Sequence, residues 1–185
     1  VLLGNCYQIG IRFGRDVQVA IANYTRAASG GDLAGNYFLG IAYRESKDIT
    51  RAADCFRIAA DQGDPMCQAL LGDCYLYSPG VETDVNRGIE LVNQAVQGGS
   101  SYGYYLLGVA HLSGTGVAQN DVEAVKCFNA AARQGCTKGM VMLGEMYRDG
   151  RGVKQNLQKA VELIRFSAEQ DDNVGQCSLG GLYFN

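Results

Sequence analysis

The sequence predicts an all-α solenoid, in which pairs of helices stack on one another along the chain. Two observations lead to this prediction: a Leu-Gly pair recurs at nearly constant spacing, and an N-cap residue for a second helix recurs at fixed distances after it. The composition agrees, because 25 glycines with only two prolines allow many helices with sharply defined ends.

The first helix of each pair, called the A helix below, carries the Leu-Gly dipeptide. These dipeptides are separated by 36, 32, 36, 36 and 36 residues and stand at Leu3-Gly4, Leu39-Gly40, Leu71-Gly72, Leu107-Gly108, Leu143-Gly144 and Leu179-Gly180. A ring follows each glycine by three residues, at Tyr7, Tyr43, Tyr75, His111, Tyr147 and Tyr183. Leucine and ring share one helix face, and the glycine lets another helix approach closely.

The second helix of each pair, the B helix, begins at a good N-cap residue. These residues are Asp16, Asp48, Asp84, Asn120 and Asn156. Four residues after each cap stands a small residue, at Ala20, Ala52, Gly88, Ala124 and Ala160. Eight residues after each cap stands a large one, at Tyr24, Phe56, Val92, Phe128 and Ile164. These spacings mark one helix face, and Gly31, Gly63, Gly99 and Gly135 then end the B helices.

A Gly-x-Gly-Val loop joins the A helix to the B helix in the later repeats. It occurs at 114–117 and 150–153, with degenerate copies at 78–81 and 10–13. The loop glycines could be suspected of holding a phosphate, but no strand precedes them and they recur with the repeat. We therefore expect them to supply positive φ angles. The second repeat has lost four residues here and has no loop glycine, which predicts a tighter turn.

At these residues the chain resembles the Sel1-like repeat family, whose helix pairs are similar to tetratricopeptide repeats. The last complete repeat matches the family pattern well, with Leu143-Gly144, Tyr147, the loop 150–153, Asn156 and Lys159-Ala160. His111, Gly88 and the shortened second loop depart from it. The resemblance implies a right-handed superhelix of antiparallel helix pairs and a role in assembling other proteins.

The repeats predict one domain over 1–185. Its units lie near 1–32, 33–64, 65–100, 101–136 and 137–172, followed by a partial helix at 173–185. Both ends fall inside A helices, so we expect an excerpt of a longer protein. Apolar residues of those end helices, Val1, Leu2, Leu3, Tyr183 and Phe184, would lack neighbours, which predicts end-to-end self-association.

No motif for catalysis, a cofactor or a metal ion stands out, so we expect a protein that is not an enzyme and binds no cofactor. The one histidine, His111, occupies the ring position of its repeat and is expected to be packed and hydrogen-bonded. A net charge of −3 without a Lys/Arg cluster argues against nucleic acid as a partner. The longest apolar stretches are too short for a membrane helix, so direct membrane insertion is not expected.

Seven cysteines without regular pairing do not require a disulfide framework. Cys6, Cys55, Cys67, Cys74 and Cys127 fall on helix faces expected to be buried, and we interpret them as small hydrophobic residues. Cys136, in a turn, is the one expected to be reactive, and Cys177 is not assigned. This pattern favours the cytoplasm, with a secreted or periplasmic location left open.

The candidate binding surface lies on the A helices, opposite the face that carries leucine and ring. We expect a concave groove there that binds a protein or peptide segment. Its predicted contact residues are Tyr37, Ile41, Arg44, Asp73, Leu76, Tyr105, Val109, Leu112, Val141, Glu145 and Arg148. Alternatively, a tightly wound superhelix would bury these side chains against neighbouring A helices.

Two functional hypotheses follow. The first is a non-enzymatic scaffold or adaptor that binds a partner segment in the A-helix groove. The second is a secreted, cysteine-rich Sel1-like bacterial protein associated with β-lactam binding or host contact. That subgroup, as the resemblance implies, places paired cysteines at regular sites in every repeat, and this chain does not.

Overall fold

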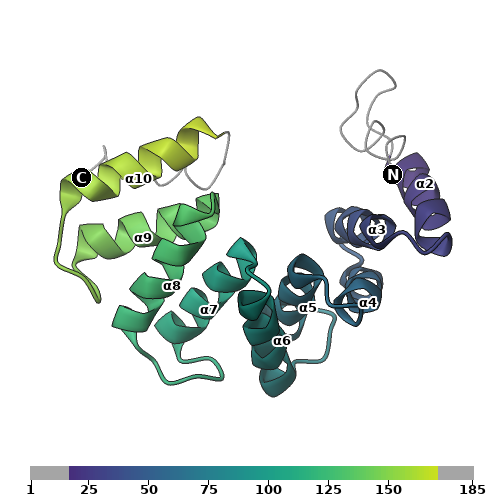
Figure 1. Cartoon of the computed structure of the whole chain (residues 1–185), viewed down its shortest axis with the longest axis horizontal. Coiled ribbons are helices and arrows are strands. Elements are labelled where there is room, and N and C mark those ends of the chain that lie inside the picture. Colours follow the sequence, from purple (N-terminus) through teal and green to yellow (C-terminus); the bar gives the residue numbers. More distant parts are fainter. Residues whose placement is uncertain (1–16, 171–185) are drawn as a thin grey trace. The chain divides into compact units, whose positions relative to one another are not determined.

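The computed structural model describes residues 17–170, and within that range every regular element is an α-helix (Figure 1). The helices are α2 (Val17–Ser29), α3 (Leu33–Glu45), α4 (Ile49–Ala60), α5 (Pro65–Tyr77), α6 (Val85–Gln97), α7 (Ser101–Ser113), α8 (Asp121–Arg133), α9 (Thr137–Asp149) and α10 (Leu157–Glu169). The odd-numbered helices are the predicted A helices, and the even-numbered ones are B helices. The all-α prediction is therefore confirmed.

Some expectations concern residues outside the described part of the chain. These are the expectations for Val1, Leu2, Leu3, Cys6, Tyr7, Asp16, Cys177, Tyr183 and Phe184.

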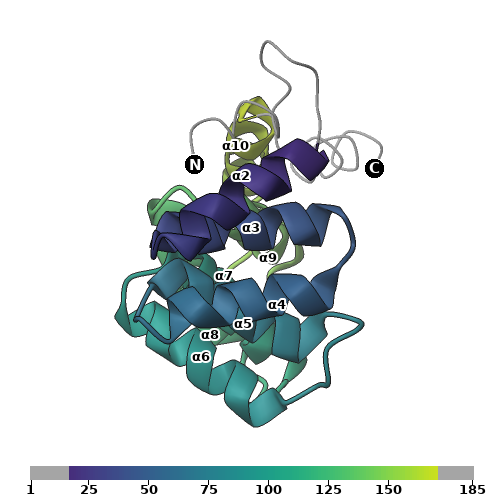
Figure 2. The same ribbon diagram turned by 90° about the vertical axis from the view of Figure 1, so that its right-hand side faces the viewer.

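The chain divides into two compact units, Val1–Leu91 and Val92–Asn185, and the division falls within α6. In the first unit, α2, α3, α4 and α5 pack in succession, each against the next (Figure 2). In the second unit, α7, α8, α9 and α10 pack in the same way, and α7 also touches α9. Each unit is thus a stack of A and B helices in which neighbours along the chain are neighbours in space.

In three of the described Leu-Gly pairs, the glycine receives the large side chain of the following B helix. A methyl group placed on Gly108 would lie 2.5 Å from Cε1 of Phe128, and one on Gly144 would lie 2.7 Å from Cγ1 of Ile164. Gly40 meets the ring of Phe56 in the same way. All three large side chains are fully buried. The predicted close approach of the two helices is therefore confirmed.

Four of the predicted N-caps are observed in the described residues. The Asp48 and Asp84 carboxylates accept hydrogen bonds from the backbone N–H groups of Arg51 (3.1 Å) and Arg87 (3.0 Å). The side-chain carbonyls of Asn120 and Asn156 do the same for the starts of α8 and α10. These bonds satisfy backbone donors that have no partner within the helix, so each B helix begins where the sequence predicts.

The loop between an A helix and a B helix is held by left-handed glycines. Gly114 and Gly116 have φ of 76° and 69°, as the sequence predicts. In the shortened second repeat, Lys47 takes the left-handed conformation instead, with φ of 64°. Despite the missing residues, the N–H of Asp48 still donates to the carbonyl of Tyr43 at 2.9 Å. The tighter turn therefore keeps the hydrogen bond that joins the N-cap residue to the ring residue in the other repeats, for example from Asn120 to His111.

Loops also join consecutive repeats. Arg151 donates two hydrogen bonds to the Asp121 carboxylate, at 3.2 and 2.9 Å, across 30 residues of sequence. Gly152, beside Arg151, lies directly against the Asp121 backbone carbonyl and has φ of 64°. A side chain at this position would be strained and would also push the two repeats apart.

In three of the described repeats, the tyrosine that follows the Leu-Gly pair packs beneath a cation from the next B helix. Arg51 lies 5.6 Å from the ring centroid of Tyr43, and Lys159 lies 5.3 Å from that of Tyr147. Arg87 is placed likewise over Tyr75. In the repeat where His111 replaces the tyrosine, Glu123 replaces the cation of the B helix, so both members of the pair differ from the other repeats.

Candidate functional site

In the first unit, the predicted A-helix face is only partly accessible. Tyr37, Ile41 and Arg44 on α3 are half-buried. Burial is the main cause that raises the pKa of Tyr37. Arg44 lies 4.0 Å from the Asp73 carboxylate on α5, which joins the A helices of two consecutive repeats. Arg44, which the sequence predicts for partner contact, therefore already has an acidic neighbour within the chain.

In the second unit, three predicted contact residues form a stripe along α7. Tyr105, Val109 and Leu112 are half-buried and pack at their base against the core cluster of Ala124, Phe128, Leu143 and Met146. The ring of Tyr105 stacks on Tyr102 at 5.6 Å. Sequence projection placed Tyr105 and Val109 opposite the core; in the structure they stay partly exposed but also contact the core cluster, because α7 packs against both α8 and α9.

A lysine from the next A helix lies over this stripe. The Lys138 ammonium on α9 is 5.3 Å from the ring centroid of Tyr102 and 5.8 Å from that of Tyr105. Further along α9, Glu145 and Arg148 are half-buried. Arg148 donates to both oxygens of Asp149, at 2.7 and 3.0 Å, and this bonding raises the arginine's pKa. The exposed part of the surface is therefore aromatic with charged margins.

Two predicted contact residues are buried and are corrected here. Leu76 is 7% exposed and packs on α6, where a methyl group on Gly88 would lie 2.7 Å from its Cγ. Glycine in place of the alanine of other repeats gives Leu76 that space. Val141 is 2% exposed. Projection on a single helix missed this because A helices of a stack have neighbours on more than one side.

The described cysteines fit the buried interpretation in part. Cys55, Cys67 and Cys74 are buried, and Cys127 is half-buried. Burial raises the pKa of Cys55, Cys74 and Cys127 to about 11, and it raises that of Cys67 as well. These four thiols are therefore protonated at neutral pH. Cys136 is half-buried at the N-cap of α9, and its reactivity stays a prediction.

His111 is half-buried, with Nδ1 3.2 Å from the Ala118 carbonyl oxygen. This contact fits the packed, hydrogen-bonded histidine that the sequence predicts. Within residues 17–170, no group of three or more His, Cys, Asp or Glu side chains is placed to hold a metal ion. In the same range, no helix has the length and apolar character needed to span a membrane.

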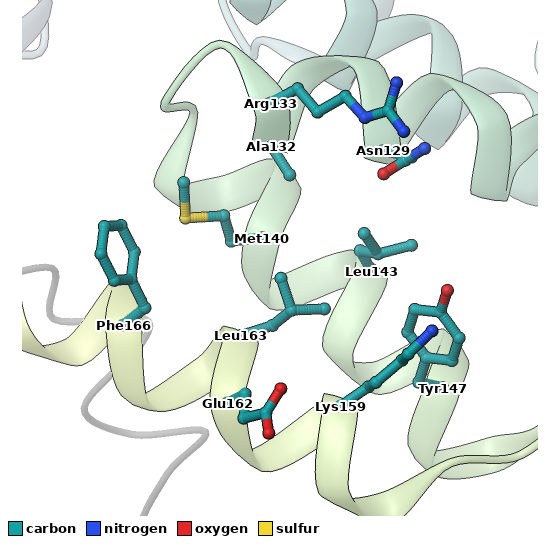
Figure 3. A pocket seen from close by; sticks show the side chains of 10 residues that line it. All are labelled: Asn129, Ala132, Arg133, Met140, Leu143, Tyr147, Lys159, Glu162, Leu163 and Phe166. Carbon is teal, nitrogen blue, oxygen red and sulfur yellow. The ribbon is translucent and has the colours of Figure 1, made fainter.

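Sequence projection missed a groove on the other side of the second unit (Figure 3). It lies between the B helices α8 and α10, with α9 beneath, and has a volume of about 480 Å³. Its lining residues are Asn129, Ala132, Arg133, Met140, Leu143, Tyr147, Lys159, Glu162, Leu163 and Phe166. A comparison between repeats, position by position, is the signal that would have found it.

Five copies of one sequence model cover nearly the whole chain. The model describes the Sel1 repeat, and it matches residues 1–32, 33–64, 65–100, 101–136 and 137–172. This chain belongs to the Sel1 repeat family. The comparison with curated proteins gave no match.

Solved Sel1 structures are similar over the whole length. A Sel1 repeat protein from Oxalobacter formigenes is 26% identical with a TM-score of 0.78, and the alignment covers 100% of this chain and 77% of that one. A protective antigen of uropathogenic Escherichia coli is 30% identical with a TM-score of 0.71, covering 99% of this chain and 40% of the antigen. This Sel1 chain therefore spans less than half of the second relative.

A third structure belongs to the cysteine-rich subgroup. Cysteine-rich protein B of Helicobacter pylori is 18% identical with a TM-score of 0.54, covering 70% of this chain and 92% of that one. At this identity the likeness concerns the fold alone. Sel1 repeat proteins are in general non-catalytic scaffolds that bind other proteins.

Proposed function

We propose that this chain is a non-catalytic interaction scaffold and that its second unit binds a partner segment on the A-helix surface formed by Tyr102, Tyr105, Val109, Leu112 and Lys138. The observation that carries the proposal is the half-exposed stripe of Tyr105, Val109 and Leu112 on α7, with Lys138 over its rings. Tyrosine combines a large apolar area with a polar tip, which suits it to protein contacts.

The charged residues at the margins of this surface indicate which partner segments it favours. Arg148 is neutralised by Asp149, and Glu145 stands one turn before it on α9. An acidic flank on the partner therefore gains little from Arg148, and aromatic and apolar contacts supply most of the affinity. In the first unit, Tyr37 and Ile41 offer a similar but smaller surface beside the Arg44–Asp73 pair. End-to-end self-association remains a separate prediction.

Site-specific photo-crosslinking tests this surface. Benzoylphenylalanine in place of Tyr105 should give a discrete protein adduct in a lysate of cells that express the chain. The matched control carries it in place of Val122, which is 51% exposed on the B helix α8 of the same unit. Both proteins are checked for unchanged helix content and melting temperature. An adduct that forms equally at both positions, or only at position 122, contradicts the proposal.

A further inference from the structure

The floor of the groove between α8 and α10 is apolar because it carries a residue type that the other repeats do not have at the same position. Its floor residue Met140 is on α9, four residues before the Leu-Gly glycine, where the other A helices have Asn36, Gln68 and Tyr104. In the first unit these equivalents form hydrogen bonds, for example from Gln68 Nε2 to the Ala60 carbonyl at 3.5 Å. Methionine removes that bond and leaves an apolar floor.

The wall on α10 is apolar as well. Phe166 is 51% exposed, and the equivalent B-helix positions have Arg26, Ile58, Gln94 and Ala130, so α4 also has an exposed apolar side chain here but only α10 has an aromatic ring. Leu163 stands where α4 and α8 have cysteines and α6 has Leu91. Repeat packing does not demand an aromatic ring at position 166, because α6 and α8 form their helix pairs with Gln94 and Ala130 there. An accessible apolar ring beside an apolar floor is typical of a binding site.

The rim adds a positive charge that the other repeats lack. Arg133 ends α8, where the equivalent B-helix positions have Ser29, Asp61, Gln97 and Glu169. In Figure 3 its guanidinium lies beside the Asn129 amide at the edge of the groove. Across the groove, Lys159 lies over the ring of Tyr147.

The rim also carries one carboxylate, that of Glu162, so the two cations Arg133 and Lys159 outnumber it. Glu162 accepts a hydrogen bond from Gln158 Nε2 at 3.2 Å. An apolar floor with cations on both walls complements an apolar segment that carries carboxylates.

We propose that the groove between α8 and α10 is a second docking site, which takes an acidic amphipathic segment of a partner protein. Apolar side chains of the segment would lie on Met140, Leu163 and Phe166, and a carboxylate would pair with Arg133. This site is on the B-helix side of the unit and stands independently of the proposed A-helix surface.

A phage-displayed library of random 12-residue peptides, selected on the whole chain, tests the proposal. We expect enriched peptides that combine apolar residues with Asp or Glu. The variants Phe166→Ser and Arg133→Glu should each weaken their binding about tenfold or more. The matched controls Val122→Ser and Lys126→Glu, both exposed on α8 outside the groove, should bind as the parent does.

Two further measurements complete the test: reversing the charge of Arg133, and following the NMR signal of Met140 on the floor of the groove. Selection on Arg133→Glu should enrich lysine or arginine in place of the acidic residues. In a spectrum of ¹³C-methyl-labelled methionines, the Met140 signal should shift on peptide addition while that of Met66 in the other unit does not. The proposal is overturned if no peptide is enriched, if the enriched peptides show no acidic bias, or if Phe166→Ser binds them unchanged.

Discussion

At the scale of single residues, helix pairs in this chain are held by a glycine facing a large side chain. Gly108 and Phe128 form one such pair, and the ring occupies the space of the absent Cβ. Glycine costs helix propensity, by about 1 kcal/mol relative to alanine. Burial of an aromatic side chain contributes about 1.5–3 kcal/mol, so the exchange stabilises the pair.

We expect Gly108→Ala to lower the free energy of unfolding by about 1–3 kcal/mol through overpacking, despite the better helix propensity of alanine. Urea denaturation followed by circular dichroism measures this change. Phe128→Ile, which copies the Ile164 of the next repeat, serves in a double-mutant cycle. Because a smaller side chain at 128 makes room for the new methyl group, the double variant should lose less than the sum of both single losses. Additive losses would show that the two residues do not meet.

Buried thiols make a second prediction at this scale. Burial raises the pKa of Cys74 from 9.0 to about 11, so the folded state holds a proton that the unfolded state releases. The stabilisation is complete below pH 9 and is lost as the pH rises toward 11. We therefore expect the free energy of unfolding to fall in this window, and to fall less steeply for Cys74→Ala. A variant with the parent's slope would contradict the assigned burial.

At the scale of elements, the pairing of ring and cation links each A helix to its B helix. Within residues 17–170, three repeats have it, at Tyr43, Tyr75 and Tyr147, whereas the repeat with His111 and Glu123 lacks it. That repeat instead pairs Glu123 with Lys126 at 2.7 Å within α8.

Restoring the common pair should couple α7 to α8. We expect His111→Tyr and Glu123→Arg to stabilise the protein more together than the sum of their separate effects, by about 0.5–1 kcal/mol. Thermal unfolding of the two single variants and the double variant gives this coupling energy. A coupling near zero would mean that ring and cation merely lie close in the other repeats.

The helices and their ends were predictable because they depend on contacts a few residues apart or within one repeat. Asn120 and Asn156 cap α8 and α10 as their side chains require, and Gly114 ends α7 in the left-handed conformation. Contacts between helices, within a repeat or between repeats, were not predictable from one helix at a time. Leu76 is therefore buried against the expectation, and the groove at Met140, which three helices line together, was missed.

At the scale of the whole molecule, the same repeat builds two compact units, and each presents surfaces of its own. The second unit carries both the aromatic stripe on α7 and the α8–α10 groove, and α9 contributes residues to each. A scaffold with two such surfaces can hold two segments of one partner, which raises the effective concentration of the second contact. The repeated helix pairs build the scaffold, and residues that differ between repeats would determine which partner segments it binds.

The cysteines test which of the two hypotheses about the whole protein holds. They stand in several repeats without regular pairs, and Cys67 and Cys74 lie seven residues apart on the rigid helix α5, too far for a bond between them. We expect at least five free thiols when the protein is denatured without reductant and quenched by alkylation, as counted by mass spectrometry. Chemically reduced protein provides the reference for seven alkylated sites. Three disulfides in the unreduced sample would instead favour the secreted, cysteine-rich class, because cysteines that serve only as small buried residues form no disulfide bonds.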